Sequence, residues 1–416
     1  MKKIFLLALI PAMVLGGCKK FIEDFDESPN NPTVVTAPLL LTASQVSTFT
    51  SYTGQLGRFS AMMTQQTTGT DFQMLDYANY NIGEGDVNNE WSTIYSEALI
   101  DAKTLVDQFG ADNPYYTGIA KVLMAMNLGI ATDFWGDVPY SQALQGLENF
   151  SPSFDSQEDI IASIQTLCDE AIAHFGAAPE ENVILPSFDD LVFAGDVAQW
   201  TKTAWIIKAR YALRLSKKDA SAAAQAALDN LTGAMDAGLA GPEDDCNAIF
   251  GDAGNELNQW YAFQNSRGGY MKMSEHLVTM MQGISDPRIP YYCTLDTSGT
   301  YSGTPLGSVD QSTSDVGSYF ASPSNPLPLV TYVEAKFIEA EANMILGNGG
   351  PAADAHNAAV AAHVMMVTGA SDPVFEAAQA AETSATISRE KILMHKYIAR
   401  FSHVEAYSDW RRTDYP

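Results

Sequence analysis

Through most of the chain beyond residue 36, apolar residues recur every three or four positions, which is the spacing of one face of an α-helix. The clearest case lies between Pro114 and Leu144. Its apolar stripe consists of Ile119, Val122, Leu123, Met126 and Ile130. Small residues on the opposite side let a neighbouring helix approach closely, and Gly136 followed by Val138-Pro139 ends the periodic pattern. This stretch is therefore predicted to be a helix that packs against a core.

N-cap side chains and glycine stops divide the rest of the chain into further helices. We predict one helix from Thr36, and others over 87–109, 156–176, 196–215, 219–238, 332–346, a partner ending at Val367, and about 387–411. The Gly/Pro-rich turn at 347–351 is so short that the helices on either side of it must fold back antiparallel, as in a tetratricopeptide unit. The pattern predicts an all-α, predominantly helical fold built from tetratricopeptide-like hairpins.

The stretch from about 240 to 329 interrupts this pattern, and only 274–283 within it reads clearly as a helix. It is rich in Gly, Ser, Thr, Asn and Pro, yet it contains Trp260, Tyr261, Phe263, Tyr270, Tyr291, Tyr292, Tyr301, Tyr319 and Phe320. Long loops in compact domains are usually functional or disordered, and disordered segments are poor in aromatic residues. We expect a single helical domain over 36–416 with a loop-rich insertion that offers a binding surface, although each ring has the alternative role of pinning the loops to the helices.

The first 17 residues have the pattern of a secretory signal peptide. Lys2 and Lys3 precede a short apolar run, and small residues precede Cys18. Cys18 stands where a bacterial lipoprotein signal places the lipidated cysteine, so we predict a lipid anchor; an ordinary signal peptide with an incidental cysteine is the alternative. The polar, proline-punctuated residues 18–35 read as a tether. Their acidic cluster is either an export signal that directs the protein to the outer face of the outer membrane or part of a linker without such a signal.

Charge narrows the range of partners. The chain has 23 Lys and Arg against 50 Asp and Glu, a formal net charge of −27. Such a surface repels phosphate backbones and anionic lipid. We therefore expect no nucleic-acid partner, and contact with a membrane through the lipid anchor alone.

Patterns typical of catalysis are absent from the sequence. Its six histidines show no His-Glu-x-x-His spacing, and neither a Gly-x-Ser-x-Gly elbow nor a calcium loop occurs. Carboxylates are too numerous for a glycosidase pair to be chosen from sequence, because such a pair is defined by its separation in space. We predict no metal, no cofactor and no enzymatic activity.

Several polar residues have structural explanations. Cys168 is expected in the core, and a disulfide between Cys246 and Cys293 is an open alternative. Asp133 and Asp137 are expected to cap backbone N–H groups around Gly136, with contact to a cation or ligand as the alternative. Near the end of the chain, Arg411 or Arg412 is expected to pair with a carboxylate and fix the last helix.

Four stretches carry recognisable patterns. They are D-F-W-G-D-V-P-Y-S-Q-A-L from Asp133, G-D-V-A-Q-W-T-K-T-A-W-I-I-K-A-R-Y-A-L-R-L-S from Gly195, E-A-K-F-I-E-A-E-A-N-M-I-L-G from Glu334, and E-A-Y-S-D-W-R-R-T-D-Y-P from Glu405. In content and order they resemble the SusD/RagB family of outer-membrane nutrient-binding lipoproteins, and its SusD-like branch in particular. Relatives usually continue beyond the last motif, so we expect either a longer natural chain or a different ending.

The resemblance implies a lipid-anchored protein on the outer membrane that faces the cell exterior. It would capture glycans and deliver them to a TonB-dependent outer-membrane barrel of the SusC-like kind. Peptides are an alternative cargo within the family. Two further alternatives are a scaffold of the transporter complex that binds no ligand, and a surface glycoside hydrolase.

Family ligand sites are generally assembled from loops near the N-terminus together with the mid-chain insertion. Sugars require flat aromatic faces and polar groups for their hydroxyls, and the stretch 70–81 and the insertion offer both. The residues expected to bind ligand are Asp71, Phe72, Tyr77, Trp91, Trp260, Tyr261, Arg267, Tyr270, Tyr301 and Tyr319. For Trp91, which lies in a helical pattern, burial in the core is the alternative.

Overall fold

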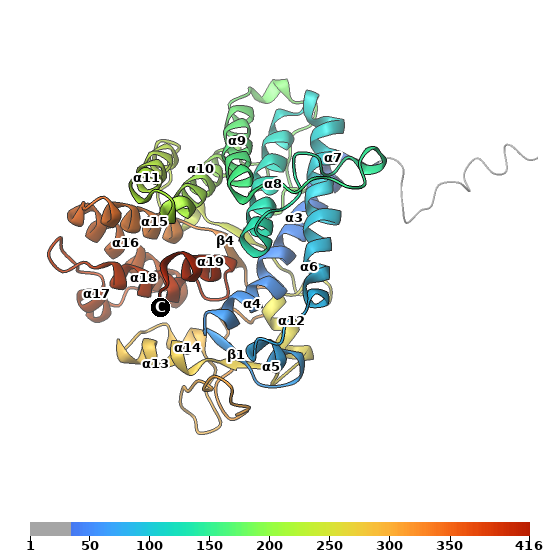
Figure 1. Cartoon of the computed structure of the whole chain (residues 1–416). Coiled ribbons are helices and arrows are strands. Elements are labelled where there is room, and N and C mark those ends of the chain that lie inside the picture. The colour runs from blue at the N-terminus through green and yellow to red at the C-terminus, as the bar shows by residue number, and fades with distance from the viewer. Residues whose placement is uncertain (1–34) are drawn as a thin grey trace, which may run out of the picture.

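The protein is described by a computed structural model that covers residues 35–416 (Figure 1). The predicted signal peptide, Cys18 and nearly all of the tether lie outside the described residues. Within them the chain is predominantly helical, as the apolar spacing predicts. The long helices are α3 (Ala37–Thr53), α7 (Ile100–Phe109), α8 (Pro114–Trp135), α9 (Gln157–Phe175), α10 (Val197–Arg214), α11 (Ala220–Asp236), α15 (Tyr332–Ile345) and α16 (Gly349–Thr368).

These helices pack as a row of neighbours that largely follows chain order: α7 on α8, α8 on α9, α9 on α10, α10 on α11, α11 on α15, and α15 on α16. The N-caps explain where several of them begin. Ser156, Asp196 and Asp219 each accept hydrogen bonds from backbone N–H groups in the first turn of α9, α10 and α11. The antiparallel hairpins of the prediction are therefore present.

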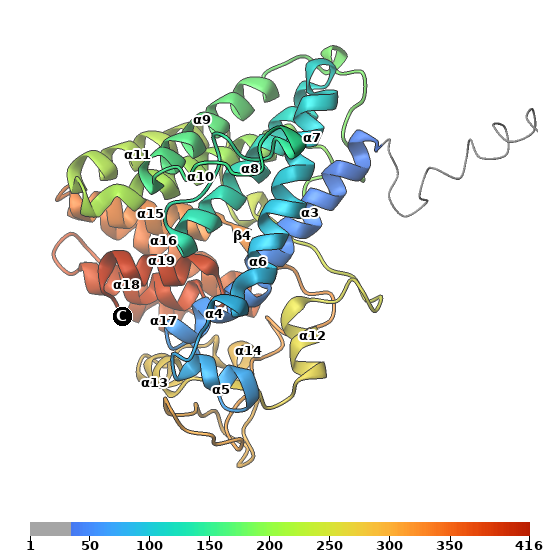
Figure 2. The ribbon, with the colours of Figure 1, turned by 45° about the vertical axis from the view of Figure 1, so that its right-hand side comes forward.

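The remaining helices and the strands complete the fold, and most of them lie below this row in Figure 2. The helices are α4 (Gln55–Met63), α5 (Phe72–Ala78), α6 (Asn88–Thr93), α12 (Gln259–Ser266), α13 (Glu275–Gly283), α14 (Ile289–Tyr292), α17 (Pro373–Gln379), α18 (Arg389–Ala399) and α19 (Val404–Thr413). The strands are β1 (Thr67–Gly69), β2 (Cys246–Ala248), β3 (Met271–Met273) and β4 (Leu327–Val330). Strand β2 pairs antiparallel with β4 and closes the base of the insertion, while β1 pairs antiparallel with β3 and fastens the insertion to the N-terminal helices.

Three sequence predictions need correction. The helix expected over 387–411 is two helices, because the chain turns between them at Ser402, whose φ of 61° lies in the left-handed region. The insertion contains three helices, whereas the sequence predicted one. Helix α12 is short, and its N-cap Asn258 follows other residues that are typical of loops, so the sequence gives no clear signal for it. Cys246 and Cys293 are both free and buried, so the disulfide alternative is wrong.

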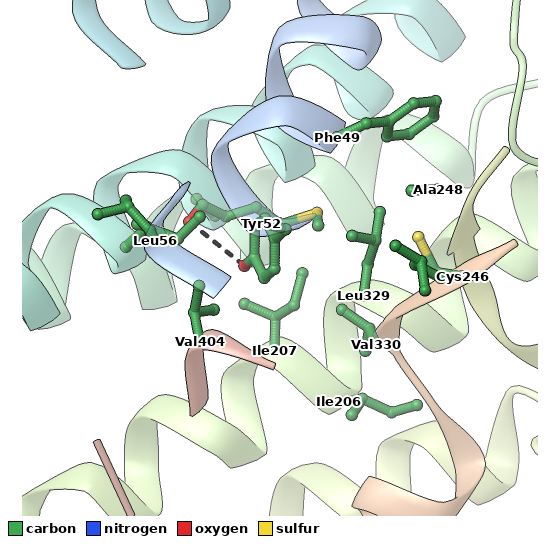
Figure 3. Packing of buried hydrophobic residues seen from close by; sticks show 14 of the residues in the cluster. Phe49, Tyr52, Leu56, Ile206, Ile207, Cys246, Ala248, Leu329, Val330 and Val404 are labelled. Carbon is green, nitrogen blue, oxygen red and sulfur yellow. Dashed lines mark hydrogen bonds between the residues drawn. The ribbon is translucent and has the colours of Figure 1, made fainter. Parts of the chain in front are cut away.

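The core forms where α3, α10, β4 and α19 meet (Figure 3). Tyr52 from α3, Ile207 from α10, Val330 from β4 and Val404 from α19 are each at most 3% exposed. The hydroxyl of Tyr52 lies 3.4 Å from the carbonyl oxygen of Met126 on α8, to which it donates. Helices and a strand from the N-terminal, middle and C-terminal parts of residues 35–416 thus share this apolar cluster.

The four family-like motifs meet in buried ion pairs beside this core. The guanidinium of Arg210 donates to both carboxylate oxygens of Glu334, at 2.6 and 2.7 Å. Arg214, one turn further along α10, bridges Asp133 at 2.8 Å and Glu405 at 2.6 Å. Two arginines from the second motif thus pair with one carboxylate from each of the other three motifs, so these motifs hold the fold together.

A second buried cluster fixes the last helix. Arg412 donates to both carboxylate oxygens of Glu341, at 2.5 and 2.8 Å, and also to Asp409. Lys396 bonds to Glu341 at 3.1 Å and to Asp409 at 3.0 Å. The expected pairing of an arginine in the last motif with a carboxylate is confirmed for Arg412. Asp137 accepts from the first N–H of α9, at Gln157, while Asp133 forms the ion pair described above instead of a cap.

Burial of the histidines makes the fold sensitive to acid. Desolvation lowers the pKa of all six, and that of His403 falls to about 3. The unfolded chain therefore binds more protons than the folded one as pH falls below about 6.5, and the folded state loses stability. Within residues 35–416, four carboxyl groups act in the opposite direction but are fewer than the histidines. Burial raises the pKa of Asp133 to about 6 and that of Asp245 to about 8, and it also raises the pKa values of Glu90 and Asp101.

We therefore expect the free energy of unfolding to fall steadily from pH 7 to pH 5, by about 1.4 kcal/mol per pH unit for each proton taken up. Urea denaturation at closely spaced pH values measures this slope. Calorimetric unfolding in two buffers of different ionisation enthalpy gives an independent proton count. A stability that is level over this interval would contradict the expectation.

Candidate ligand-binding surface

An exposed pair of aromatic rings lies where the N-terminal part of the chain meets the insertion. Phe72, the first residue of α5, is 63% exposed, and its ring stacks on that of half-buried Tyr270 with centroids 4.8 Å apart and planes 21° from parallel. The side chain of Asp71 caps α5 by accepting the N–H of Phe72 at 2.9 Å. Two of the predicted residues, far apart in sequence, thus form one stacked pair in which the ring of Phe72 is the exposed member, with a third residue at its edge.

The β1–β3 pairing explains why these rings meet. Gly69 opposes Met271, and the N–H of Thr70 donates to the carbonyl of Tyr270 at 2.9 Å, so the residues that follow β1 lie beside those that precede β3. The carbonyl of Gly269, which has a φ of 81°, accepts from the Thr70 hydroxyl at 2.7 Å and from the Gln311 side chain at 2.9 Å. The ends of β1 and β3 are therefore fixed both by their mutual pairing and by the side chains of Thr70 and Gln311. Backbone hydrogen bonds of this kind pre-organise a surface before ligand arrives.

Behind the pair lies Phe263 of α12, whose buried ring meets that of Tyr270 edge to face at 6.3 Å. Two guanidinium groups contact the Phe263 ring. That of Arg58 from α4 lies 4.6 Å from the ring centroid, and that of exposed Arg267 lies 5.8 Å from it. Arginine over an aromatic face is a favourable arrangement, and it brings positive charge next to the exposed pair.

Trp260 and Tyr77 do not reach this surface. Trp260 is fully buried, and its indole N–H donates to the hydroxyl of Ser402. Tyr77 is 7% exposed; its ring packs edge to face on Phe59, and its hydroxyl donates to Asp86 at 2.9 Å. Burial raises the pKa of Tyr77 to about 12. We remove both from the candidate set, because an enclosed ring offers no face to a ligand.

Trp91 belongs to a different group of rings. It stacks on Tyr95 at 4.4 Å and meets Trp135 edge to face at 5.4 Å, and from there ring contacts continue through Phe134 to Tyr407. Trp91 is half-buried in this row. The alternative role for Trp91 is burial in the core, and its ring is partly buried against the core cluster.

The remaining predicted tyrosines, Tyr261, Tyr301 and Tyr319, are spread over the insertion. All three are half-buried. Tyr319 packs edge to face on Phe320 at 4.9 Å, and burial raises its pKa to about 12. Within residues 35–416, no ring contact joins any of the three to Phe72 or Tyr270. They stay predictions, separate from the surface formed by Phe72 and Tyr270.

Sequence reasoning missed Arg58 and Gln311. A signal for Arg58 was present, because it stands in the largely apolar run Q-L-G-R-F-S-A-M-M without an acidic residue one turn away on its helix. Gln311 had no comparable signal, since its role depends on a backbone carbonyl that folding brings close.

The described part of the chain contains no three His, Cys, Asp or Glu side chains placed to hold a metal ion. None of its helices is long and apolar enough to cross a membrane. An aromatic face with arginines beside it is suited to binding.

Comparison with known proteins decides the family. The family model described as SusD-like, "Starch-binding associating with outer membrane", matches residues 29–416, which include every element described above. The chain belongs to the SusD-like family. Members of this family are nutrient-binding proteins of the outer membrane, and they bind without catalysing a reaction. No curated protein sequence matches the chain significantly.

Solved structures agree with this assignment of a SusD-like fold. A SusD/RagB family protein from Bacteroides thetaiotaomicron is 26% identical with a TM-score of 0.78, over 92% of this chain and 88% of that one. A protein named as chitin-binding is 23% identical with a TM-score of 0.76, over 92% and 88% of the two chains. A chitin-binding SusD homolog from Flavobacterium johnsoniae is 20% identical with a TM-score of 0.75, over 90% and 86%. The predicted helical, tetratricopeptide-like fold is confirmed.

Proposed function

We propose that this SusD-like protein captures glycans at the cell surface, and that the stacked pair Phe72 and Tyr270 forms part of its binding surface. The main support for this proposal is that the ring of Phe72 is 63% exposed and lies on backbone that is fixed by hydrogen bonds. The C–H groups of a sugar ring suit a flat aromatic face of this kind. The names of two chitin-binding structures with the same fold support glycans over peptides as the cargo.

The anchor and the partner belong to the same proposal. Cys18 is proposed to carry the lipid that holds the protein on the outer face of the outer membrane. A SusC-like TonB-dependent barrel is proposed to receive the glycan. The membership of the SusD-like family supports both points, and the absence of a membrane-spanning helix among the described residues is compatible with a lipid anchor.

Replacing Tyr270 by Ala is expected to weaken glycan binding about tenfold or more, since an aromatic residue central to a contact contributes about 2 kcal/mol or more. Phe72→Ala should act in the same direction. The free energy of unfolding should change little for Phe72→Ala, because this ring is mostly exposed. Calorimetric titration against a glycan panel gives the affinity, and urea denaturation gives the stability.

Phe188→Ala is the matched control, because Phe188 is 91% exposed and lies in the segment between α9 and α10, outside the proposed surface. It should bind as the wild type does. If the protein bound peptides but no glycan, its cargo would be a peptide. Unchanged glycan affinity in both Phe72→Ala and Tyr270→Ala would refute the proposed surface. If the wild type bound neither glycans nor peptides, the scaffold role would be favoured.

A further inference from the structure

Arg58 is an unusual buried cation. It is 9% exposed, and its Nε and Nη1 atoms are buried without any hydrogen-bond partner. Its Nη2 atom is not among the fully buried atoms that lack a partner, and the residue as a whole keeps 9% of its surface exposed. Buried charges are normally paired, because an unpaired one loses its hydration without compensation.

Other buried arginines of the same protein show the usual arrangement. Arg210 and Arg412 each form two hydrogen bonds with one carboxylate, and Arg288 does the same with Asp286. Arg58 contacts only the face of the Phe263 ring, at 4.6 Å. A structural role in an ion pair therefore does not account for it.

The charges near Arg58 increase this imbalance. Exposed Arg267 contacts the same Phe263 ring, and across residues 35–416 neither arginine has a carboxylate oxygen within 4.0 Å. Burial, with the charge of Arg267 added, lowers the pKa of Arg58 to about 10. Glu90 on α6 attracts Arg58 but forms no ion pair with it, and burial raises the pKa of Glu90. In a chain with a net charge of −27, two unpaired arginines at one ring are a local exception.

This exception lies directly beside the proposed glycan surface. Phe263, which carries both guanidinium groups, contacts Tyr270, and Tyr270 stacks on Phe72. An aromatic face for a sugar ring and a positive edge for an anion are thus contiguous. Arginine binds carboxylate and sulfate groups with charge-assisted hydrogen bonds, which neutral hydroxyls cannot equal.

We infer that the ligand of this surface is an acidic glycan, whose uronate carboxylate or sulfate group is bound by Arg58 and Arg267 while a neighbouring sugar ring packs on the exposed side of the stacked pair Phe72 and Tyr270. The inference rests on the proposed glycan-capture function and specifies its ligand class. It also gives the unpaired charge of Arg58 a role, since the anion supplies the partner that the folded chain lacks.

The test uses glycans in matched pairs that differ only in charge, namely polygalacturonate against its methyl ester and chondroitin sulfate against desulfated, carboxyl-reduced chondroitin. The wild type is expected to bind the acidic member of at least one pair ten times more tightly or better. Arg267→Gln should remove this preference by lowering the affinity for the acidic member. Arg389→Gln is the matched control, because Arg389 is also exposed but lies on α18.

Arg58→Met gives a second readout. It should remove the acidic preference and raise the melting temperature, because an unpaired buried charge is replaced by an apolar chain of similar length. A lowered melting temperature with the preference intact would make Arg58 a structural residue and overturn its assigned role.

Failure of the inference and failure of the proposed function give different results. Equal binding of acidic and neutral members, unaffected by Arg267→Gln, would overturn the acidic-ligand inference while glycan capture stands. Binding of no glycan in a broad panel that includes neutral chitin and starch oligosaccharides would overturn both. If the protein bound only acidic peptides, the arginine site would stand, but its ligand would be a peptide and glycan capture would be refuted.

Discussion

Replacing Arg210 by Met is expected to lower the free energy of unfolding by about 3–5 kcal/mol. The guanidinium of Arg210 is 2% exposed, and it donates to both oxygens of Glu334 and to the carbonyl of Leu329. Its removal leaves Glu334, which is fully buried, with Arg400 as its remaining cation. Arg210 is the largest of the charges that lower the pKa of Glu334 to about 2 against the effect of burial, so its removal leaves a buried carboxylate with much less compensation.

Urea denaturation at pH 7 measures the effect. Lys218→Met is the matched control, because Lys218 pairs with Glu158 at 2.5 Å while both side chains are more than 60% exposed. An exposed pair contributes about 1 kcal/mol or less. If the two variants lost stability equally, the buried network would have no special part in holding the four motifs together.

Replacing Trp260 by Ala is expected to lower the free energy of unfolding by about 3–5 kcal/mol, as for other large buried aromatic side chains. Its ring is fully buried between Phe263 and Phe401, with centroid distances of 6.5 and 6.1 Å. The indole N–H also donates to Ser402 in the turn between α18 and α19. Truncation would therefore leave a cavity and loosen the contact between the insertion and the C-terminal helices.

Trp260→Phe should recover much of the lost stability, since it refills most of the cavity and lacks only the indole and its hydrogen bond. Glycan affinity, measured on the folded fraction at low temperature, should fall far less for Trp260→Ala than for Tyr270→Ala. A Trp260→Ala protein that unfolds like the wild type and has lost only its glycan binding would show that Trp260 contacts the ligand.

The family motifs and the proposed binding surface occupy different parts of the molecule. Asp133, Arg214 and Glu405, from three of the motifs, are buried together in ion pairs. Phe72 and Tyr270 lie outside all four motifs. Resemblance to the SusD-like family therefore predicts the fold, whereas the ligand class depends on residues outside the four motifs.

The sequence by itself determined the helices whose signals are local. The apolar stripe of 114–135 and the caps at Ser156, Asp196 and Asp219 predict elements that the structure contains, because residues within one turn of each other decide them. The four motifs likewise predict the family, and the match over residues 29–416 confirms it.

Only the tertiary structure decided which aromatic residues are exposed and which are enclosed. Trp260 and Tyr270 stand in the same loop-rich stretch and look alike in sequence, yet one is buried against Phe401 and the other stacks on exposed Phe72. The pairing that brings Thr70 to Gly269 joins residues 199 positions apart. Contacts across such distances depend on how helices and strands pack together, and no local pattern of residues records them.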